Sequence, residues 1–378
     1  MKQHLVTSLT ALALTCGIAK AQEGMIEPET LTVEERISEG GHVFVMDMGL
    51  NGPSSIYVMN AGDLSVEGNI GAGTFSQMRF SDDRRALFTA SIYMSRFTYG
   101  NVEGVVHEWD PATLMARREF NVSEKTAQTL TQAGALNLSG DGTRLFVQNA
   151  TPATSVNVVD LADPAVQTEV PTPGCWTAYP TRDGAAFVTL CGDGTIRKFT
   201  VAADGGVGAP AQSDKIFDPD ADPLFGNAVR VGDELVYLSY AGTLYMVDDS
   251  GEVPVLTGKA AFAQDGWGPS GYGLMTYHAP SDMLFVTMHS GLADGTHKAP
   301  AEEIWAIDMG SREVVARGKA NGESNIAVAG SQDPVLFGLS HHGSLHRYDV
   351  TPGDPVTIYE TASREGVAAF PTLVATDF

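Results

Sequence analysis

Histidine is the side chain in this sequence best suited to bind a metal or move a proton at neutral pH. His289, His297 and the adjacent pair His341 and His342 fall in loops or near the ends of expected strands. Their positions follow no regular ligand spacing. We therefore interpret them as surface or hydrogen-bonded histidines, and the sequence predicts no metal site.

The common catalytic and cofactor-binding motifs are absent from the chain. A serine nucleophile elbow would read Gly-x-Ser-x-Gly, a zinc protease His-Glu-x-x-His, a phosphate loop Gly-x-x-x-x-Gly-Lys and a haem attachment site Cys-x-x-Cys-His. None of these occurs in the sequence. The chain is therefore expected to hold no catalytic residue of its own.

The N-terminus has the form of a secretory signal. An apolar run from Leu5 to Ile18 follows Lys2 and precedes Ala19-Lys20-Ala21, a small-x-small sequence that signal peptidase cuts. The run is shorter than the ~20 residues that cross a bilayer, which disfavours a membrane anchor. A buried helix and a lipoprotein site at Cys16 are the other readings. We expect residues 1–21 to be a signal peptide and the mature chain to be exported.

The charge of the chain limits its partners. The formal net charge is −23, and removal of the leader would take away two lysines and no acidic residue. A strongly acidic protein is repelled by nucleic acid and by anionic membranes. We expect neither as a partner.

Two cysteines, Cys175 and Cys191, remain in the mature chain. Export to an oxidising compartment makes a disulfide the default state of such a pair. Two thiols without histidine partners are too few for a closed structural zinc site. The sequence predicts a disulfide between them.

The elements that must position these side chains are short apolar strands in repeated pairs. The first strands of the pairs begin near Val43, Ala86, Arg144, Ala185, Glu234, Met283 and Val335. The second strands span 56–60, 105–110, 155–160, 196–200, 244–248, 304–308 and 345–349. Polar turns rich in glycine and aspartate precede several first strands, as in 139–143, and such residues tolerate the positive φ that tight turns require.

A repeat of roughly 40 to 50 residues with about four short strands is typical of a β-propeller blade. Seven pairs predict an all-β, seven-bladed β-propeller over residues 39–378. The last strand, near 367–374, should complete a blade that begins near the mature N-terminus. Residues 22–38 are acidic and lack a strand pattern, so they are expected to form an arm outside the propeller or an ordinary tail.

Four segments carry a resemblance to a known family. They are 93–100 leading into 105–110, 146–160, 174–176 with 191–194, and 295–305, which reads GTHKAPAEEIW. In content and order they resemble the heavy chain of aromatic amine and methylamine dehydrogenases, and the aromatic amine enzyme is the more similar of the two. The resemblance covers roughly residues 40–350.

This resemblance implies a function for a chain without catalytic motifs. In the family the heavy chain is a seven-bladed propeller, and a separate light chain carries the tryptophan tryptophylquinone. Two heavy and two light chains form a periplasmic heterotetramer that oxidises primary amines to aldehydes and ammonia. Electrons then pass to a small blue-copper protein. We accordingly expect no cofactor bound by this chain.

One segment departs from the family pattern. Family members have a phenylalanine shortly after the first strand, where it lines the path of the amine, whereas here Asp47 is followed by Met48-Gly49-Leu50-Asn51-Gly52-Pro53. Met48 or Leu50 could line that path instead, or the segment could be an ordinary turn. The alternative to the whole reading is a free-standing secreted propeller that acts as a lactonase-like hydrolase or as a binding module, since the fold alone does not choose between them.

Overall fold

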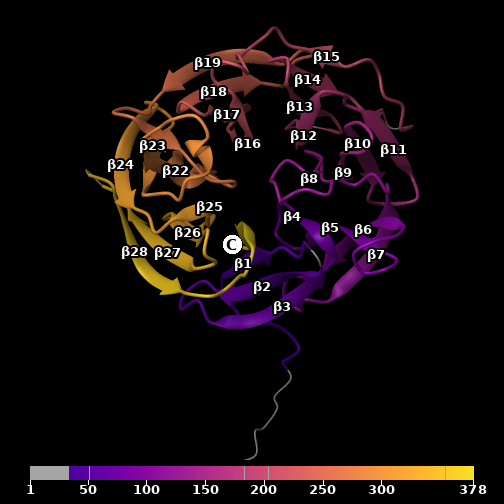
Figure 1. Ribbon diagram of the computed structural model, residues 1–378, viewed down its shortest axis with the longest axis horizontal. Helices are drawn as coiled ribbons and strands as arrows, with labels where there is room; N and C mark the ends of the chain where they lie inside the picture. The colour runs from indigo at the N-terminus through magenta and orange to yellow at the C-terminus, as the bar shows by residue number, and fades with distance from the viewer. Residues whose placement is uncertain (1–33, 51, 183, 203, 354) are drawn as a thin grey trace, which may run out of the picture. The chain divides into compact units, whose positions relative to one another are not determined.

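Seven antiparallel sheets arranged in a ring make up the part of residues 36–378 that the structure describes (Figure 1). This computed structural model describes residues 34–378 except 51, 183, 203 and 354. The expected signal peptide (1–21) and most of the expected arm (22–38) lie outside the described residues. The seven-bladed β-propeller predicted from the sequence is confirmed.

The strands of each blade follow one another from the centre of the ring outward, except in the first blade, whose innermost strand is the last of the chain. Blade 1 consists of β29 (Pro371–Thr376), β1 (His42–Asp47), β2 (Ser54–Asn60) and β3 (Val66–Ala72). Blade 2 consists of β4 (Thr74–Phe80), β5 (Leu87–Met94), β6 (Val102–Trp109) and β7 (Ala116–Val122). Blade 3 consists of β8 (Leu136–Leu138), β9 (Arg144–Asn149), β10 (Ser155–Asp160) and β11 (Gln167–Pro171).

The remaining blades repeat the pattern. Blade 4 consists of β12 (Cys175–Pro180), β13 (Phe187–Cys191), β14 (Ile196–Phe199) and β15 (Ala211–Gln212), and blade 5 of β16 (Leu224–Val231), β17 (Glu234–Ser239), β18 (Thr243–Asp248) and β19 (Val255–Ala261). In blade 6 both β20 (Trp267–Pro269) and β21 (Met275–His278) pair with β22 (Met283–Ser290), which is followed by β23 (Glu303–Asp308) and β24 (Glu313–Lys319). Blade 7 consists of β25 (Glu323–Val328), β26 (Val335–Ser340), β27 (Leu345–Thr351) and β28 (Thr357–Arg364). Two short 3-10 helices, η1 (Ala279–Ser281) and η2 (Thr296–Lys298), lie in the connections of blade 6.

A buried ring on the second strand of every blade builds the core between blades. These side chains are at most 3% exposed and are Phe44, Phe88, Phe146, Phe187, Tyr237, Phe285 and Phe337. Rings of adjacent blades meet, as between Phe146 and Phe187, whose centroids are 5.1 Å apart. Burying one such side chain stabilises a fold by roughly 1.5–3 kcal/mol. Because every blade buries an aromatic side chain at the same strand position, the blades pack against one another in a similar way.

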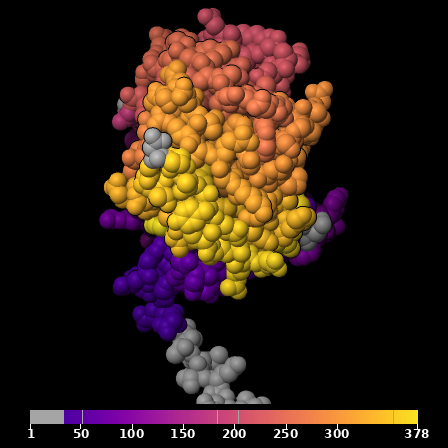
Figure 2. All heavy atoms as spheres, turned by 90° about the vertical axis from the view of Figure 1, so that its left-hand side faces the viewer, coloured from indigo at the N-terminus to yellow at the C-terminus, as the bar shows by residue number. Residues whose placement is uncertain are grey.

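The ring closes by pairing the two ends of the propeller. Strand β29 pairs antiparallel with β1, with Val45 opposite Val374. Figure 2 shows the C-terminal part, in yellow, directly against the indigo N-terminal strands. The prediction that the last strand completes the first blade is confirmed. At the start of the propeller, Ile37 donates its backbone N–H to Ala112 O at 2.9 Å.

The disulfide predicted between Cys175 and Cys191 is present, with an S–S distance of 2.01 Å. The two residues face each other across the β12–β13 pair. The Cys175 backbone N–H donates to Thr172 O and that of Cys191 to Thr195 O, so neither bonds across the pair. Side chains are closest at such non-hydrogen-bonded positions, which is why a bridge fits there.

The propeller has two faces that differ in their connections. The turns between the second and third strands of the blades, such as 48–53 and 95–101, lie on one face together with the segments that join consecutive blades. We call the face that carries these turns the pair-turn face. Because neighbouring strands are antiparallel, turns between first and second strands, such as 81–86, lie on the opposite face.

Candidate functional site

The turn singled out by the sequence, 48–53, joins β1 to β2 on the pair-turn face. The Met48 backbone N–H donates to Phe370 O at 3.0 Å, and the Phe370 N–H donates to Asp47 Oδ1 at 2.7 Å. The turn is therefore held against the segment that enters β29, the innermost strand of the same blade. Met48 itself is 3% exposed and belongs to the interior.

Close packing of two glycines gives this turn its shape. A β-carbon on Gly49 would lie 2.1 Å from Gly52 O, a distance at which atoms overlap, so a larger residue does not fit. The Gly49 N–H donates to Ser54 Oγ at 3.1 Å, and Thr74 Oγ1 donates to Gly52 O at 2.9 Å. Leu50, which is 41% exposed, carries the apolar side chain that this turn presents at the surface.

A phenylalanine from the next blade lies beside this turn. A β-carbon on Gly52 would be 3.6 Å from Phe97 Cζ. Phe97 stands in the β5–β6 turn with a φ of 63°, and its N–H donates to Met94 O at 3.2 Å. The same turn is closed by the Arg96 N–H, which donates to Tyr99 O at 2.8 Å.

These turns expose apolar side chains to an unusual degree. We define the apolar patch as Leu50, Phe97, Tyr99 and Phe370; Phe97 is 69% exposed and Tyr99 is 73% exposed. An aromatic side chain exposed to water contributes no burial of apolar surface to the stability of the fold. Exposed apolar side chains gathered on a surface mark interaction sites. Leu50 was predicted from the sequence and Phe97 was not, although the turn Phe97-Thr98-Tyr99-Gly100 has two rings where turn residues are usually polar.

A small cavity of about 110 Å³ lies next to the patch at the mouth of the central channel. Phe370 belongs to both the patch and the wall of the cavity, which is completed by Leu130, Thr131, Tyr272, His341, Ala369, Pro371 and Thr372. The Oγ1 atoms of Thr131 and Thr372 are 2.9 Å apart, and Thr131 Oγ1 donates to Ser76 O at 2.8 Å. These bonds occupy the hydroxyl groups at the cavity floor, and the wall above them combines apolar side chains with the imidazole of His341.

The histidines have two kinds of environment. Burial lowers the pKa of His297 and of His341, and the adjacent Lys298 and His342 lower them further. His297 stacks on Tyr240 with ring centroids 4.4 Å apart, and His289 Nδ1 lies 2.7 Å from Ser290 O. Both histidines therefore have structural contacts, as interpreted from the sequence. His341 lines the small cavity, where its ring centroid is 6.0 Å from that of Tyr272.

Within the described ranges, no group of three or more His, Cys, Asp and Glu side chains is placed to hold a metal ion. Nor does the described part of the chain contain a helix with the length and apolar character needed to cross a membrane. The site thus consists of an apolar surface and a small cavity beside it. Such a surface can bind a partner and guide an apolar substrate, because it excludes water from whatever it contacts.

Solved structures with a similar fold are propellers of low sequence identity. Hsv2 from Kluyveromyces lactis superposes with a TM-score of 0.55 at 12% identity, covering 86% of this chain and 99% of that one. Dihydro-heme d1 dehydrogenase NirN in complex with DHE gives a TM-score of 0.52 at 16% identity, covering 88% and 74%. These likenesses concern the fold alone.

Sequence comparison identifies the family. Residues 40–376 match the family described as methylamine dehydrogenase heavy chain (MADH). The methylamine dehydrogenase heavy chain of Methylophilus methylotrophus is 24% identical, over 94% of this chain and 92% of the relative. That of Methylorubrum extorquens is also 24% identical, over 99% and 90%. The resemblance found in the sequence segments is confirmed, and the chain belongs to the methylamine dehydrogenase heavy chain family.

Proposed function

We propose that this chain is the heavy, non-catalytic subunit of a periplasmic amine dehydrogenase and that its apolar patch binds the light chain. The complex would contain two heavy and two light chains and would oxidise primary amines to aldehydes and ammonia. A blue-copper protein would accept the electrons. The closer likeness to the aromatic amine enzyme stays a prediction, since the relatives named above are methylamine dehydrogenases.

The exposed rings of Phe97 and Tyr99 are the observation that carries the proposal. Aromatic side chains are enriched in the centres of protein interfaces, where they contribute most of the binding energy. The two rings stand in a turn fixed by backbone hydrogen bonds, so they would lose little conformational freedom on binding. A rigid apolar surface of this kind is more typical of an interface with a permanent partner than of a surface that stays in contact with water.

The expected cofactor belongs to the partner. Tryptophan tryptophylquinone is made from two tryptophans, and Trp267 and Trp305 of this chain do lie close, with ring centroids 5.6 Å apart. The Arg317 guanidinium stacks on both rings, and Trp305 Nε1 donates to Glu303 Oε2 at 2.6 Å. These contacts fit a packed structural stack. We therefore propose that the quinone is on the light chain, where it would accept the two electrons removed from the amine.

Residues of this chain would shape the path to that quinone. Leu50 and Phe97 stand in adjacent turns of neighbouring blades, and Phe97 would supply the ring that the first of these turns lacks. Met48 is buried, so it would support the turn from within. The apolar walls would exclude water around the amine and select it by size and shape.

Assembly with the light chain tests the proposal. The proposal requires a short, cysteine-rich exported chain encoded beside this one. We expect mature heavy chain co-expressed with that chain to purify as a heterotetramer that oxidises amines with an artificial electron acceptor. The heavy chain alone should be inactive. Phe97→Asp should weaken assembly at least tenfold, because loss of a central interface aromatic typically costs 2 kcal/mol or more.

Tyr359→Asp is the matched control, since Tyr359 is 49% exposed on the outermost strand of blade 7, away from the patch. Assembly and activity of this variant should equal those of the parent. Equal effects of the two substitutions, or a heavy chain that stays monomeric beside a folded light chain, would contradict the proposal. Lactone hydrolysis by the heavy chain alone would favour the free-standing propeller instead.

A further inference from the structure

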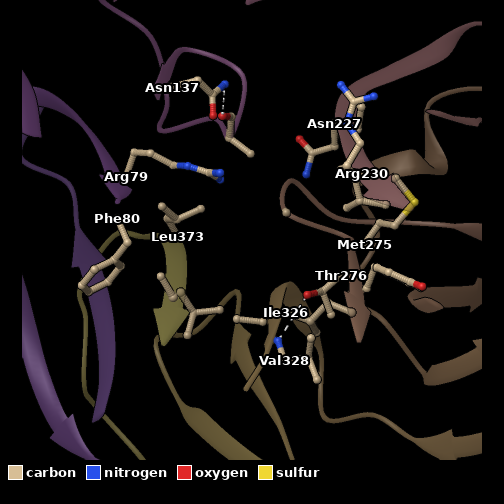
Figure 3. Close-up of a pocket in the computed structure, with 18 of the residues that line it drawn as sticks. Arg79, Phe80, Asn137, Asn227, Arg230, Met275, Thr276, Ile326, Val328 and Leu373 are labelled. Carbon is tan, nitrogen blue, oxygen red and sulfur yellow. Dashed lines mark hydrogen bonds between the residues drawn. The ribbon is translucent and has the colours of Figure 1, made fainter. Parts of the chain in front are cut away.

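The central channel contains a second, larger cavity of about 430 Å³. Its wall is formed by the innermost strands of all seven blades, including Arg79 of β4, Asn227 of β16 and Leu373 of β29 (Figure 3). Volumes of roughly 300–1,000 Å³ are typical of small-molecule sites. The proposed function makes no use of this cavity.

The cavity lies toward the face opposite the apolar patch. Along β29, Pro371 and Thr372 line the small cavity at the pair-turn face, whereas residues 373–376 line the large one. The contact between Thr131 and Thr372, at 2.9 Å, therefore falls between the two cavities. A ligand in the large cavity would not compete with the light chain for the patch.

Two arginines without strong partners give the cavity a positive side. Arg79 extends from β4 into the cavity (Figure 3), and its buried Nε makes no hydrogen bond with any described residue. Its ion pair with Asp82 is 3.9 Å long, and the two side chains are 42% and 84% exposed, so water screens it strongly. Arg84 has a ring contact, 5.6 Å from guanidinium carbon to Phe80 centroid.

The two guanidinium groups also repel each other. Burial lowers the pKa of Arg84, the positive charge of Arg79 lowers it further, and the negative charges of Asp82 and Asp377 oppose this with smaller effects. Arginine nevertheless stays protonated in proteins, so both charges persist. A protein of net charge −23 thus keeps two adjacent cations at one cavity, an arrangement that a bound anion would stabilise.

A third arginine of the cavity, Arg230, has its guanidinium group bound within the fold. The guanidinium of Arg230 donates to both carboxylate oxygens of Asp249 at 2.8 Å and to Pro180 O at 2.7 Å. Its donors are largely satisfied within the fold. Arg79 has no comparable set, which separates a side chain that holds the structure from one that is available to a ligand.

The neighbouring polar and apolar groups define the ligand further. The side-chain amide of Asn227 has no hydrogen-bond partner among the described residues and projects into the cavity with Arg79 on the other side (Figure 3). Met275, Ile326 and Leu373 form an aliphatic wall. The cavity therefore combines charged and amide donors with an apolar surface.

We infer that this cavity binds a small organic carboxylate, with its head group on Arg79, Arg84 and Asn227 and its aliphatic body on Met275, Ile326 and Leu373. Guanidinium groups bind carboxylates through paired, charge-assisted hydrogen bonds. The aliphatic wall adds the burial of apolar surface, which a purely inorganic anion cannot use. Both halves of the cavity are then occupied by one molecule.

Calorimetric titration of the mature chain with hexanoate tests this assignment. Hexanoate should bind with a millimolar or tighter Kd, and 1-hexanol and inorganic phosphate should each bind at least tenfold more weakly. Arg79→Gln and Arg84→Gln should each weaken hexanoate binding at least tenfold. Arg85→Gln removes the same charge from the same turn, but Arg85 does not line the cavity, so its Kd should stay within twofold of the parent.

Thermal unfolding of each variant shows that it is folded, and the comparison of hexanoate with 1-hexanol needs no variant at all. Absence of hexanoate binding to the parent would overturn the inference. So would equal losses in Arg79→Gln and Arg85→Gln, or binding of phosphate as tight as that of hexanoate. Because the assay uses the heavy chain alone, its outcome is independent of light-chain assembly.

Discussion

At the scale of single residues, the apolar patch joins side chains from two blades. Leu50 comes from the β1–β2 turn and Phe97 from the β5–β6 turn, and the two turns lie side by side, since a β-carbon on Gly52 would be in ordinary contact with the Phe97 ring. A substitution in either turn would change the shape of the same surface. Under the proposed function, the selectivity for the amine should therefore depend on how these two turns pack.

Leu50→Phe tests this dependence. The larger, rigid ring should narrow the path beside Phe97 and change relative transition-state binding of amines by roughly 1–3 kcal/mol. We expect the kcat/KM ratio of short aliphatic to aromatic amines to shift in the assembled enzyme, without loss of activity. Leu292→Phe, at a leucine of blade 6 that is 39% exposed, should leave the ratio unchanged; an unchanged ratio in Leu50→Phe would exclude Leu50 from the path.

Met48→Phe should behave differently from Leu50→Phe. Met48 is buried, and an added ring in a packed interior costs typically 1–3 kcal/mol of stability. The sequence placed Met48 and Leu50 in one turn but did not distinguish the inward side chain from the outward one. It also gave no sign that Phe97 would lie against Gly52, since that contact depends on how two blades pack.

At the scale of elements, blade 4 has the shortest outer strands. Strand β14 spans four residues and β15 two, and only two residue pairs join them. The disulfide connects the two inner strands of this blade, β12 and β13. It therefore cross-links the two inner strands of a blade whose short outer strands contribute few hydrogen bonds.

Replacing both cysteines with serine should destabilise the propeller. Cross-linking a loop of about 15 residues contributes roughly 3 kcal/mol through the unfolded state, and the separation here is 16 residues. Urea unfolding should show this loss, and hydrogen exchange should speed up most in blade 4. Reductant should destabilise the parent and leave the Cys175→Ser/Cys191→Ser variant unaffected; equal stability of parent and variant would contradict the role.

The strands that the sequence predicted are those with continuous apolar character. The second strand of blade 3 was expected to begin at Arg144 and the third to span 155–160, as they do in β9 and β10. The outermost strands were not placed because they are half exposed, as in β19, where exposed and partly buried residues alternate. Some innermost strands are too short or interrupted to show a pattern, as in β8 with three residues and in the split pair β20 and β21.

At the scale of the whole molecule, one charged cluster fastens the ends of the ring. His42, at the start of β1, is 3% exposed. Its Nδ1 is 2.9 Å from Asp377 Oδ2, and its Nε2 is 3.4 Å from Glu67 Oε2. Asp377 follows β29 directly and Glu67 belongs to β3, so one imidazole connects the first and last segments of the propeller.

Ring closure should therefore depend on pH. The hydrogen bond with Asp377 raises the pKa of His42; burial opposes this, and the charges of Asp377 and Glu67 add to it. Since the folded-state pKa lies above the unfolded value of about 6.5, the stabilisation is fully present below that value and is lost as the pH rises through the folded-state pKa. A charge-assisted hydrogen bond of this kind contributes roughly 1.5–3 kcal/mol.

The measurement is the free energy of unfolding by urea between pH 6 and pH 9, for the parent, His42→Gln and His342→Gln. The parent should exceed His42→Gln in stability most at pH 6, and the difference should shrink as the pH rises. Other groups that titrate in this range cancel in the difference, including His297 and His341, whose lowered pKa values act in the opposite direction. His342→Gln, at an exposed position, should follow the parent. A difference between parent and His42→Gln that stays constant with pH would show that the imidazole closes the ring by packing and neutral hydrogen bonding, without its charge.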